Sequence, residues 1–226
     1  CALPISEVQV LGFCKGAGMI HPALATMLGY VVTDAAISAT ALQTLCEQAA
    51  DHSFNRLTVD GDMSTNDSLF CLASGLAGNG KITDPQSPGG RALLGALREV
   101  CVALARAIAA DGEGATKRVE VQVRGAGSDA RADDLARSVA GSSLVKSALF
   151  GNDPNWGRVL STIGARAAAR GEPQPFSRTR CSIQGLEVFR DGEPTGVPGD
   201  ELRDRMTAKD LVIAIDLGEP EGQGLA

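Results

Sequence analysis

KGAGMIHPALATML is the sequence of residues 15–28, and the expected fold and chemistry depend on it more than on any other stretch. It places a candidate nucleophile, Thr26, directly after the small residue Ala25, in an apolar run that follows a glycine-rich turn. If the Thr26 Oγ attacks the carbonyl carbon of Ala25, the peptide bond rearranges to an ester that water can hydrolyse. Thr26 would then carry a free α-amine beside its hydroxyl, which is one form of activated nucleophile. The junction of Ala25 and Thr26 is therefore a candidate cleavage site and catalytic site.

Ordinary pKa values favour the α-amine over a lysine as the base. An α-amine titrates near 8 and a lysine side chain near 10.4, so at neutral pH roughly a tenth of the amine is free base, against well under a thousandth of the lysine. Lys15 is therefore interpreted as a fixed positive charge that can hold a carboxylate. An Ala-Thr pair alone also fits an ordinary buried threonine, so the assignment needs the rest of the chain.

Further sequence blocks follow residues 15–28. They are TD at 33–34, FN at 54–55, VDGDMSTND at 59–67, GLAGN at 75–79, DGEGATK at 111–117, SSLVK at 142–146 and GNDPNWGR at 151–158. As a set, in this order, they closely resemble the ornithine acetyltransferases, the bifunctional glutamate N-acetyltransferases of arginine biosynthesis. The resemblance covers most of the chain as far as Arg158 and is looser beyond it.

The resemblance implies an α/β fold in which mixed sheets are sandwiched with outer helices, as in the N-terminal-nucleophile hydrolases. It divides the chain into the end of an α-chain-like segment (residues 1–25), a β-chain catalytic core (26–158) and a C-terminal helix and strand region (159–226). Family members have a longer N-terminal segment with a Thr-Gly oxyanion hole and a final tail that reaches the substrate. Only 14 residues precede Lys15 here. We therefore expect a polypeptide truncated at both ends, whose activity alone is impaired.

The same resemblance implies a two-step acetyl transfer. Thr26 takes the acetyl group from N-acetylornithine, ornithine leaves, and glutamate attacks the acetyl-threonine ester; some members also accept acetyl-CoA. Thr26 is then the nucleophile, and Lys15, Thr26 and Glu113 bind substrate, with the Glu113 carboxylate pairing with the amine end of ornithine. No metal or organic cofactor is expected. The implied partner is the complementary N-terminal α chain, in an α2β2 heterotetramer.

Two other functions remain open. A threonine-nucleophile amidohydrolase or aminopeptidase would use the same residues but pass the acyl group to water. An inactive truncated remnant would only fold or bind a partner. No role is assigned to Lys146 or Arg158, and Trp156 is interpreted as an anchor for the start of a helix.

Composition narrows the possible partners and location. The net charge of −6 over 226 residues argues against nucleic-acid binding, and the apolar runs are too short to span a membrane. The six cysteines form no C-x-x-C pair, which is typical of reduced thiols in a cytoplasmic protein. Cys14, beside Lys15, could be a reactive thiolate, although a structural thiol is the interpretation that we favour.

Periodicity predicts a mixture of helices and strands. Apolar residues at helical spacing indicate a helix over about 90–110. Further helices are expected over 36–50, 133–139, 143–150 and 156–168, the last capped by Asp153. Strands are expected at 119–123 and 211–215, with a strand pair around Gln184 and Gly185. Residues 85–90, 171–175 and 191–199 are predicted loops.

Some motifs resemble metal or nucleotide sites only in part. The acidic run at residues 60–67 suggests a calcium loop, but Thr65 stands where such a loop needs glycine, so a polar turn or helix start is predicted. The glycines around Glu113 are not followed by Gly-Lys-Ser/Thr, so nucleotide binding is not expected. His21 precedes Pro22, which suits a packed or turn-bonding histidine better than a base.

Overall fold

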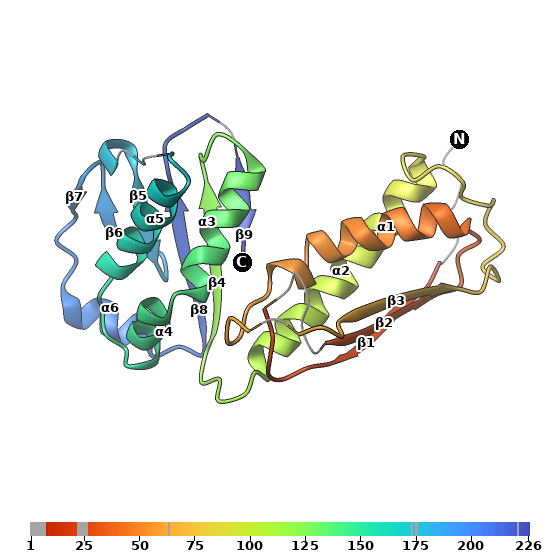
Figure 1. Cartoon of the computed structure of the whole chain (residues 1–226), viewed down its shortest axis with the longest axis horizontal. Coiled ribbons are helices and arrows are strands. Elements are labelled where there is room, and N and C mark those ends of the chain that lie inside the picture. The colour runs from red at the N-terminus through yellow and green to blue at the C-terminus, as the bar shows by residue number, and fades with distance from the viewer. Residues whose placement is uncertain (1–7, 22–26, 63, 173, 175, 221) are drawn as a thin grey trace. The chain divides into compact units, whose positions relative to one another are not determined.

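The computed structural model describes residues 8–21, 27–62, 64–172, 174, 176–220 and 222–226. The chain divides into two compact units, residues 1–113 and 114–226. Each unit has its own mixed sheet and its own helices, which confirms the predicted α/β fold with mixed sheets (Figure 1). In the part of the chain that the structure describes, no helix is both long enough and apolar enough to cross a membrane.

Unit 1 is a three-stranded sheet covered by two helices on one face. The strands, in the order β1-β2-β3, are β1 (Val10–Lys15), β2 (Leu28–Thr33) and β3 (Ser68–Ala73). The helices are α1 (Ala39–Asp51) and α2 (Pro88–Ala110), with a short 3₁₀ turn at Phe54–Arg56. β1 pairs antiparallel with β2, and β2 pairs parallel with β3.

Alternate residues of the sheet separate a packed face from an open face. Val31 of β2 is fully buried in a core with Leu97 of α2 and Leu45 of α1. The approach of α2 is close at Gly12, where an added Cβ would lie 2.6 Å from a methyl carbon of Val100. Gly12 is therefore required for the packing of helix against strand.

The open face of the unit 1 sheet is apolar. The register places Phe13, Tyr30 and Phe70 in one row across the three strands, with ring centroids 5.0 and 5.1 Å apart. The next row holds Leu11, Val32 and Leu72. Four of these side chains are 46–64% exposed: Leu11, Phe13, Phe70 and Leu72. We call these two rows the apolar sheet face.

Unit 2 is a six-stranded sheet with the strand order β7-β6-β5-β8-β4-β9. The strands are β4 (Arg118–Arg124), β5 (Arg180–Ile183), β6 (Leu186–Arg190), β7 (Glu193–Pro194), β8 (Asp210–Asp216) and β9 (Gln223–Leu225). The helices are α3 (Asp129–Gly141), α4 (Ser143–Phe150), α5 (Gly157–Ala169) and α6 (Gly199–Met206), with a 3₁₀ turn at Phe176–Arg178. β4 and β8 are parallel and the other pairs antiparallel.

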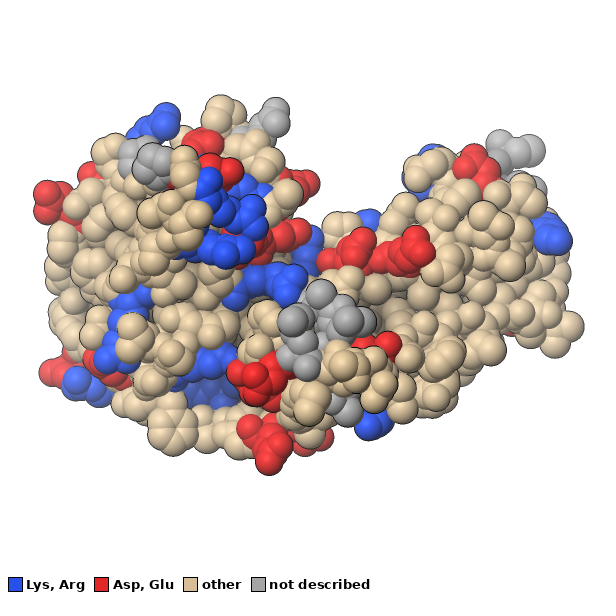
Figure 2. Space-filling view, viewed as in Figure 1, with Lys and Arg blue, Asp and Glu red and all other residues tan. Residues whose placement is uncertain are grey.

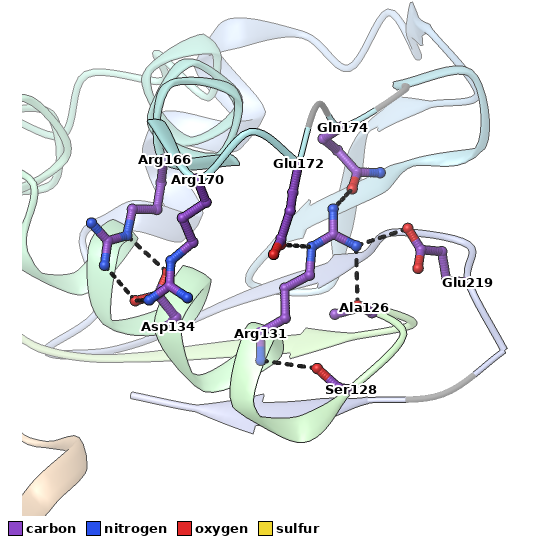
Figure 3. Close-up of polar contacts among 9 residues, drawn as sticks. All are labelled: Ala126, Ser128, Arg131, Asp134, Arg166, Arg170, Glu172, Gln174 and Glu219. Carbon is purple, nitrogen blue, oxygen red and sulfur yellow. Dashed lines mark hydrogen bonds and ion pairs between the residues drawn. The ribbon is translucent and has the colours of Figure 1, made fainter. Parts of the chain in front are cut away.

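Arginine pairs join the helices and loops of unit 2 (Figure 3). Asp134 of α3 accepts hydrogen bonds from Arg166 of α5 and from Arg170, which follows the end of α5, at 2.6–2.8 Å. Arg131, also on α3, donates to the carbonyl of Ala126, to Glu219 and to Gln174, and pairs with Glu172 at 3.2 Å. Figure 2 shows Lys and Arg side chains gathered over α3 and α5 with Asp and Glu side chains beside them. The basic side chains here are largely neutralised by local partners.

The predicted helices and the β5–β6 hairpin are confirmed, with three corrections to their surroundings. The residues predicted as a loop at 85–90 include the first turn of α2, because Ser87 caps the helix and Pro88 begins it. Asp153 does not cap α5: Trp156 is the N-cap, without a side-chain bond, and Asp153 pairs with Arg158. The predicted loop at 191–199 contains the short strand β7, paired with β6.

Candidate active site

The glycine-rich turn at residues 16–20 is held by a carboxylate from a distant loop. Asp60 accepts hydrogen bonds from the backbone N–H groups of Met19 at 2.6 Å and Ile20 at 3.0 Å. Met19 has φ +57°, a left-handed conformation that is uncommon for a residue with a side chain. Desolvation raises the pKa of Asp60, but bonds from the N–H groups of Asp62, Met19 and Ile20 together hold it below its ordinary value. Asp60 therefore stabilises a strained turn as an ionised carboxylate.

Glu113 lies against the same turn. Its backbone N–H donates to the carbonyl of Ala17 at 2.7 Å. A Cβ added to Gly18 would lie 2.7 Å from a carboxylate oxygen of Glu113, so the end of this side chain reaches the backbone of the turn. The Glu113 side chain is exposed and can meet a cationic group from solvent.

Lys15 ends β1 on the open side of the sheet, in one row with Leu28 and Ser68. It is exposed. The charge of Lys15 acts on Asp67, the residue before β3. Burial raises the pKa of Asp67, while the hydrogen bond from the Met27 N–H and the positive charge of Lys15 lower it in part. Lys15 thus directly precedes the glycine-rich turn that Glu113 contacts at Ala17 and Gly18.

The predicted nucleophile Thr26 and the predicted cleavage junction with Ala25 lie outside the described residues. The described residues on either side are well anchored. His21 Nδ1 lies 2.9 Å from the Thr58 hydroxyl, which fits the turn-bonding histidine of the prediction. On the other side, the N–H of Met27 donates to Asp67 Oδ1 at 2.6 Å.

The acidic run at residues 60–67 is a polar turn, as one of the predicted alternatives had it. Both carboxylate oxygens of Asp60 and the Oδ1 of Asp67 accept hydrogen bonds from backbone N–H groups. Among the residues that the structure describes, no group of three or more His, Cys, Asp and Glu side chains could hold a metal ion. The roles of Asp60 and Asp67 were not predicted from the sequence.

Other candidate residues have structural partners. Burial raises the pKa of the Cys14 thiol, which opposes a reactive thiolate. The Trp156 ring packs at 5.7 Å from the ring of Phe189, which fits the anchoring interpretation. Arg158 donates to the carbonyl of Leu144 at 2.8 Å and pairs with Asp153.

Lys117 has a role that the sequence reasoning missed. Its ammonium group donates to the Asn152 side chain and to the carbonyl of Met206. Burial lowers the pKa of Lys117. The bond to Asn152 joins two of the sequence blocks quoted above, residues 111–117 and 151–158. The family resemblance marked both blocks, but nothing in the sequence indicated that they are in contact.

Comparison with known proteins gives a consistent result over the whole chain. The sequence model of the ArgJ family matches residues 1–226. The arginine biosynthesis bifunctional protein ArgJ of a Synechococcus strain is 45% identical over 239 aligned residues, covering 99% of this chain and 55% of its own length. The protein of the same name from Symbiobacterium thermophilum is 46% identical over 221 residues, covering 98% of this chain and 54% of its own.

A solved structure agrees. The crystal structure of arginine biosynthesis bifunctional protein ArgJ from Bacillus halodurans superposes with a TM-score of 0.83 at 39% sequence identity. The match covers 89% of this chain and 92% of that one. This chain spans about half the length of the curated relatives that it matches, but nearly the whole of the solved chain. The chain belongs to the ArgJ family.

Proposed function

We propose that this chain is part of a cytoplasmic acyltransferase of arginine biosynthesis that moves an acetyl group from N-acetylornithine to glutamate. Thr26 is the nucleophile, after self-cleavage between Ala25 and Thr26. The observation that carries the proposal is the anchoring of Met19, Ile20 and Met27, described residues on either side of Thr26, in a chain that matches the family throughout.

The cleavage is an acyl shift followed by hydrolysis. Thr26 Oγ attacks the Ala25 carbonyl carbon, the C–N bond breaks, and the Thr26 nitrogen takes the hydroxyl proton and becomes an amine. Water then hydrolyses the ester, which leaves Ala25 with a carboxylate and Thr26 with both of its groups free. The comparison supports two polypeptides, because this chain matches 92% of a solved chain but only about half of the curated relatives.

The transfer uses the freed Thr26. Its amine accepts the hydroxyl proton while Oγ attacks the acetyl carbon of N-acetylornithine, and ornithine leaves with that proton on its nitrogen. The amine of glutamate then attacks the acetyl ester and restores the hydroxyl. The exposed Glu113 carboxylate binds the cationic end of ornithine, and Lys15 holds a substrate carboxylate.

The proposed boundary between residues 1–25 and 26–158 falls inside unit 1. β1 precedes the boundary and β2 follows it, and the two strands pair along their whole length, from Val10 opposite Thr33 to Lys15 opposite Leu28. The two polypeptides would therefore stay joined by a sheet after cleavage. Residues 159–226 supply α6, β8 and other parts of unit 2.

The complementary N-terminal α chain is the proposed partner, within an α2β2 assembly. Two observations support a partner. The curated relatives have nearly half of their length beyond this chain, and the apolar sheet face leaves aromatic and aliphatic side chains exposed. Burial of such a face against another segment is favourable, at about 25 cal/mol per Å² of apolar surface.

Acetyl transfer to glutamate distinguishes this function from the alternatives. The full-length protein is incubated with N-acetylornithine carrying a labelled acetyl group, with and without glutamate. We expect label in N-acetylglutamate and little free acetate. Label released mainly as acetate would indicate an amidohydrolase, and no release at all would indicate an inactive remnant. Replacing the donor by labelled acetyl-CoA tests the second donor.

A further inference from the structure

The loop at residues 58–67 contacts the backbone on both sides of the proposed cleavage junction. Before the junction, the Thr58 hydroxyl lies 2.9 Å from His21 Nδ1, and Asp60 accepts the N–H groups of Met19 and Ile20. After the junction, Asp67 accepts the N–H of Met27 at 2.6 Å. One loop thus fixes two backbone points that lie at either end of the segment containing Thr26.

Of the two anchored points, Met27 is nearer to Thr26 along the chain, because it follows Thr26 directly. The carbonyl of Met27 accepts the N–H of Ser68 at 3.0 Å, so sheet pairing already holds one side of this residue. Its side chain is buried, 6% exposed. The Asp67 carboxylate adds a charge-assisted bond to the N–H of the peptide that links Met27 to Thr26.

Burying the Asp67 carboxylate costs free energy of hydration. Asp67 is half-buried, and burial raises its pKa, because a carboxylate loses hydration when it leaves water. A neutral hydrogen-bonding group or the strand alone could begin the pairing of β2 with β3. A charged acceptor at this point therefore needs another reason, and its bond to the N–H of Met27, the residue that follows the proposed nucleophile, offers one.

We propose that Asp67 is a positioning residue for the acyl chemistry of Thr26, acting through the backbone N–H of Met27. The inference rests on the proposed function. An intramolecular attack is fast only when the reacting atoms are held roughly 3–3.5 Å apart with the right orientation, and a displacement of about 1 Å can lower the rate by roughly a hundredfold. Asp67 anchors the N–H of Met27 after the nucleophile, and Asp60 anchors the N–H groups of Met19 and Ile20 before it.

The experiment compares Asp67→Ala and Asp67→Asn with the wild type in the full-length protein. Asp34→Ala is the matched control, because Asp34 accepts the N–H of Gln9 at 2.8 Å in the same sheet, at the far end of the β1–β2 pair. Intact mass over time gives the rate of cleavage at Ala25 and Thr26, steady-state kinetics give kcat and KM, and thermal unfolding gives Tm.

We expect Asp67→Ala to slow cleavage by roughly tenfold or more and to lower kcat similarly, with KM for N-acetylornithine changed by less than about twofold. Asp67→Asn should recover much of the rate, since its amide oxygen can still accept the Met27 N–H. Asp34→Ala should lower Tm about as much as Asp67→Ala, but leave both rates near those of the wild type.

Two results would overturn the positioning role alone: Asp67→Ala at wild-type rates in a wild type that cleaves and transfers, or equal loss of rate in Asp34→Ala. A wild type that neither cleaves nor transfers acetyl would overturn the proposed function, and the role of Asp67 with it.

Discussion

The proposed acetyl transfer depends on three residues: the hydroxyl of Thr26 and the charges of Lys15 and Glu113. Thr26→Ala in the full-length protein should abolish both cleavage and acetyl transfer and leave Tm within a few degrees of the wild type, because the change removes the nucleophile and little packing. Thr26→Ser should keep part of both activities. Mass spectrometry, labelled-acetyl assays and thermal unfolding measure these outcomes. Wild-type turnover by Thr26→Ala would remove Thr26 from the mechanism.

Glu113 and Lys15 should affect substrate binding more than stability. Both side chains are exposed, so Glu113→Gln and Lys15→Met should change the free energy of unfolding by less than about 0.5 kcal/mol. KM for N-acetylornithine or glutamate should rise by roughly tenfold or more, as an ion pair with substrate is lost. Steady-state kinetics and chemical denaturation check the pair. Unchanged kinetics in Lys15→Met would show that Lys15 is a surface charge that does not bind substrate.

The sequence predicted the charged candidates but not the residues that hold them. Lys15 and Glu113 were predicted from the family resemblance. In the structure, Lys15 ends β1 and Glu113 contacts the turn that follows it, at Ala17 and Gly18. The bonds of Asp60 to Met19 and of Asp67 to Met27 join residues 41 and 40 positions apart. The donors in both bonds are backbone N–H groups, which every residue except proline carries, so sequence patterns could not indicate these pairs.

At the scale of elements, helices were easier to predict than strands. The helix α2 has one apolar stripe, and its spacing indicated the helix. The strands β1, β2 and β3 were missed because both of their faces carry apolar residues. Phe13 and Tyr30 lie on the open face of strands whose packed face is also apolar, so the alternation that marks a half-buried strand is absent.

The bond between α3 and α5 should make unit 2 sensitive to acid. The hydrogen bond from Arg166 is the main cause of the lowered pKa of Asp134, with Arg166 and Arg170 charges adding to it. A lowered folded-state pKa gives stability that is present above the unfolded pKa, about 3.9, and is lost as the pH falls through the folded value. Asp134→Asn should therefore destabilise the protein at pH 7, and this loss should shrink as the pH falls below the unfolded pKa.

We expect this loss at pH 7 to be about 1 kcal/mol, since both arginines are more than a third exposed and solvent weakens the pairs. Denaturant unfolding at several pH values measures it. Asp200→Asn is the control, because Asp200 pairs with Arg203 while 91% exposed and should have little effect. A loss of stability in Asp134→Asn that persists unchanged at pH 3 would contradict the assignment.

In the whole molecule, the apolar sheet face should be the surface that binds the remainder of the N-terminal α chain, beyond residues 1–25. Phe70→Arg should weaken association of this chain with a separately produced N-terminal segment by roughly tenfold or more, because it places a charge in an apolar interface. Leu76→Arg is the control, since Leu76 lies on the loop after β3 and is 83% exposed. Sedimentation or size-exclusion chromatography of the mixtures measures the complex. Equal binding by both variants would move the interface elsewhere.

The intact mass of the full-length protein under denaturing conditions shows whether the chain cleaves itself between Ala25 and Thr26. We expect two polypeptides, one beginning with Thr26, that elute together under native conditions because β1 and β2 remain paired. Thr26→Ala should give one uncleaved chain. A wild-type protein that transfers acetyl to glutamate as a single, unbroken polypeptide would contradict the account.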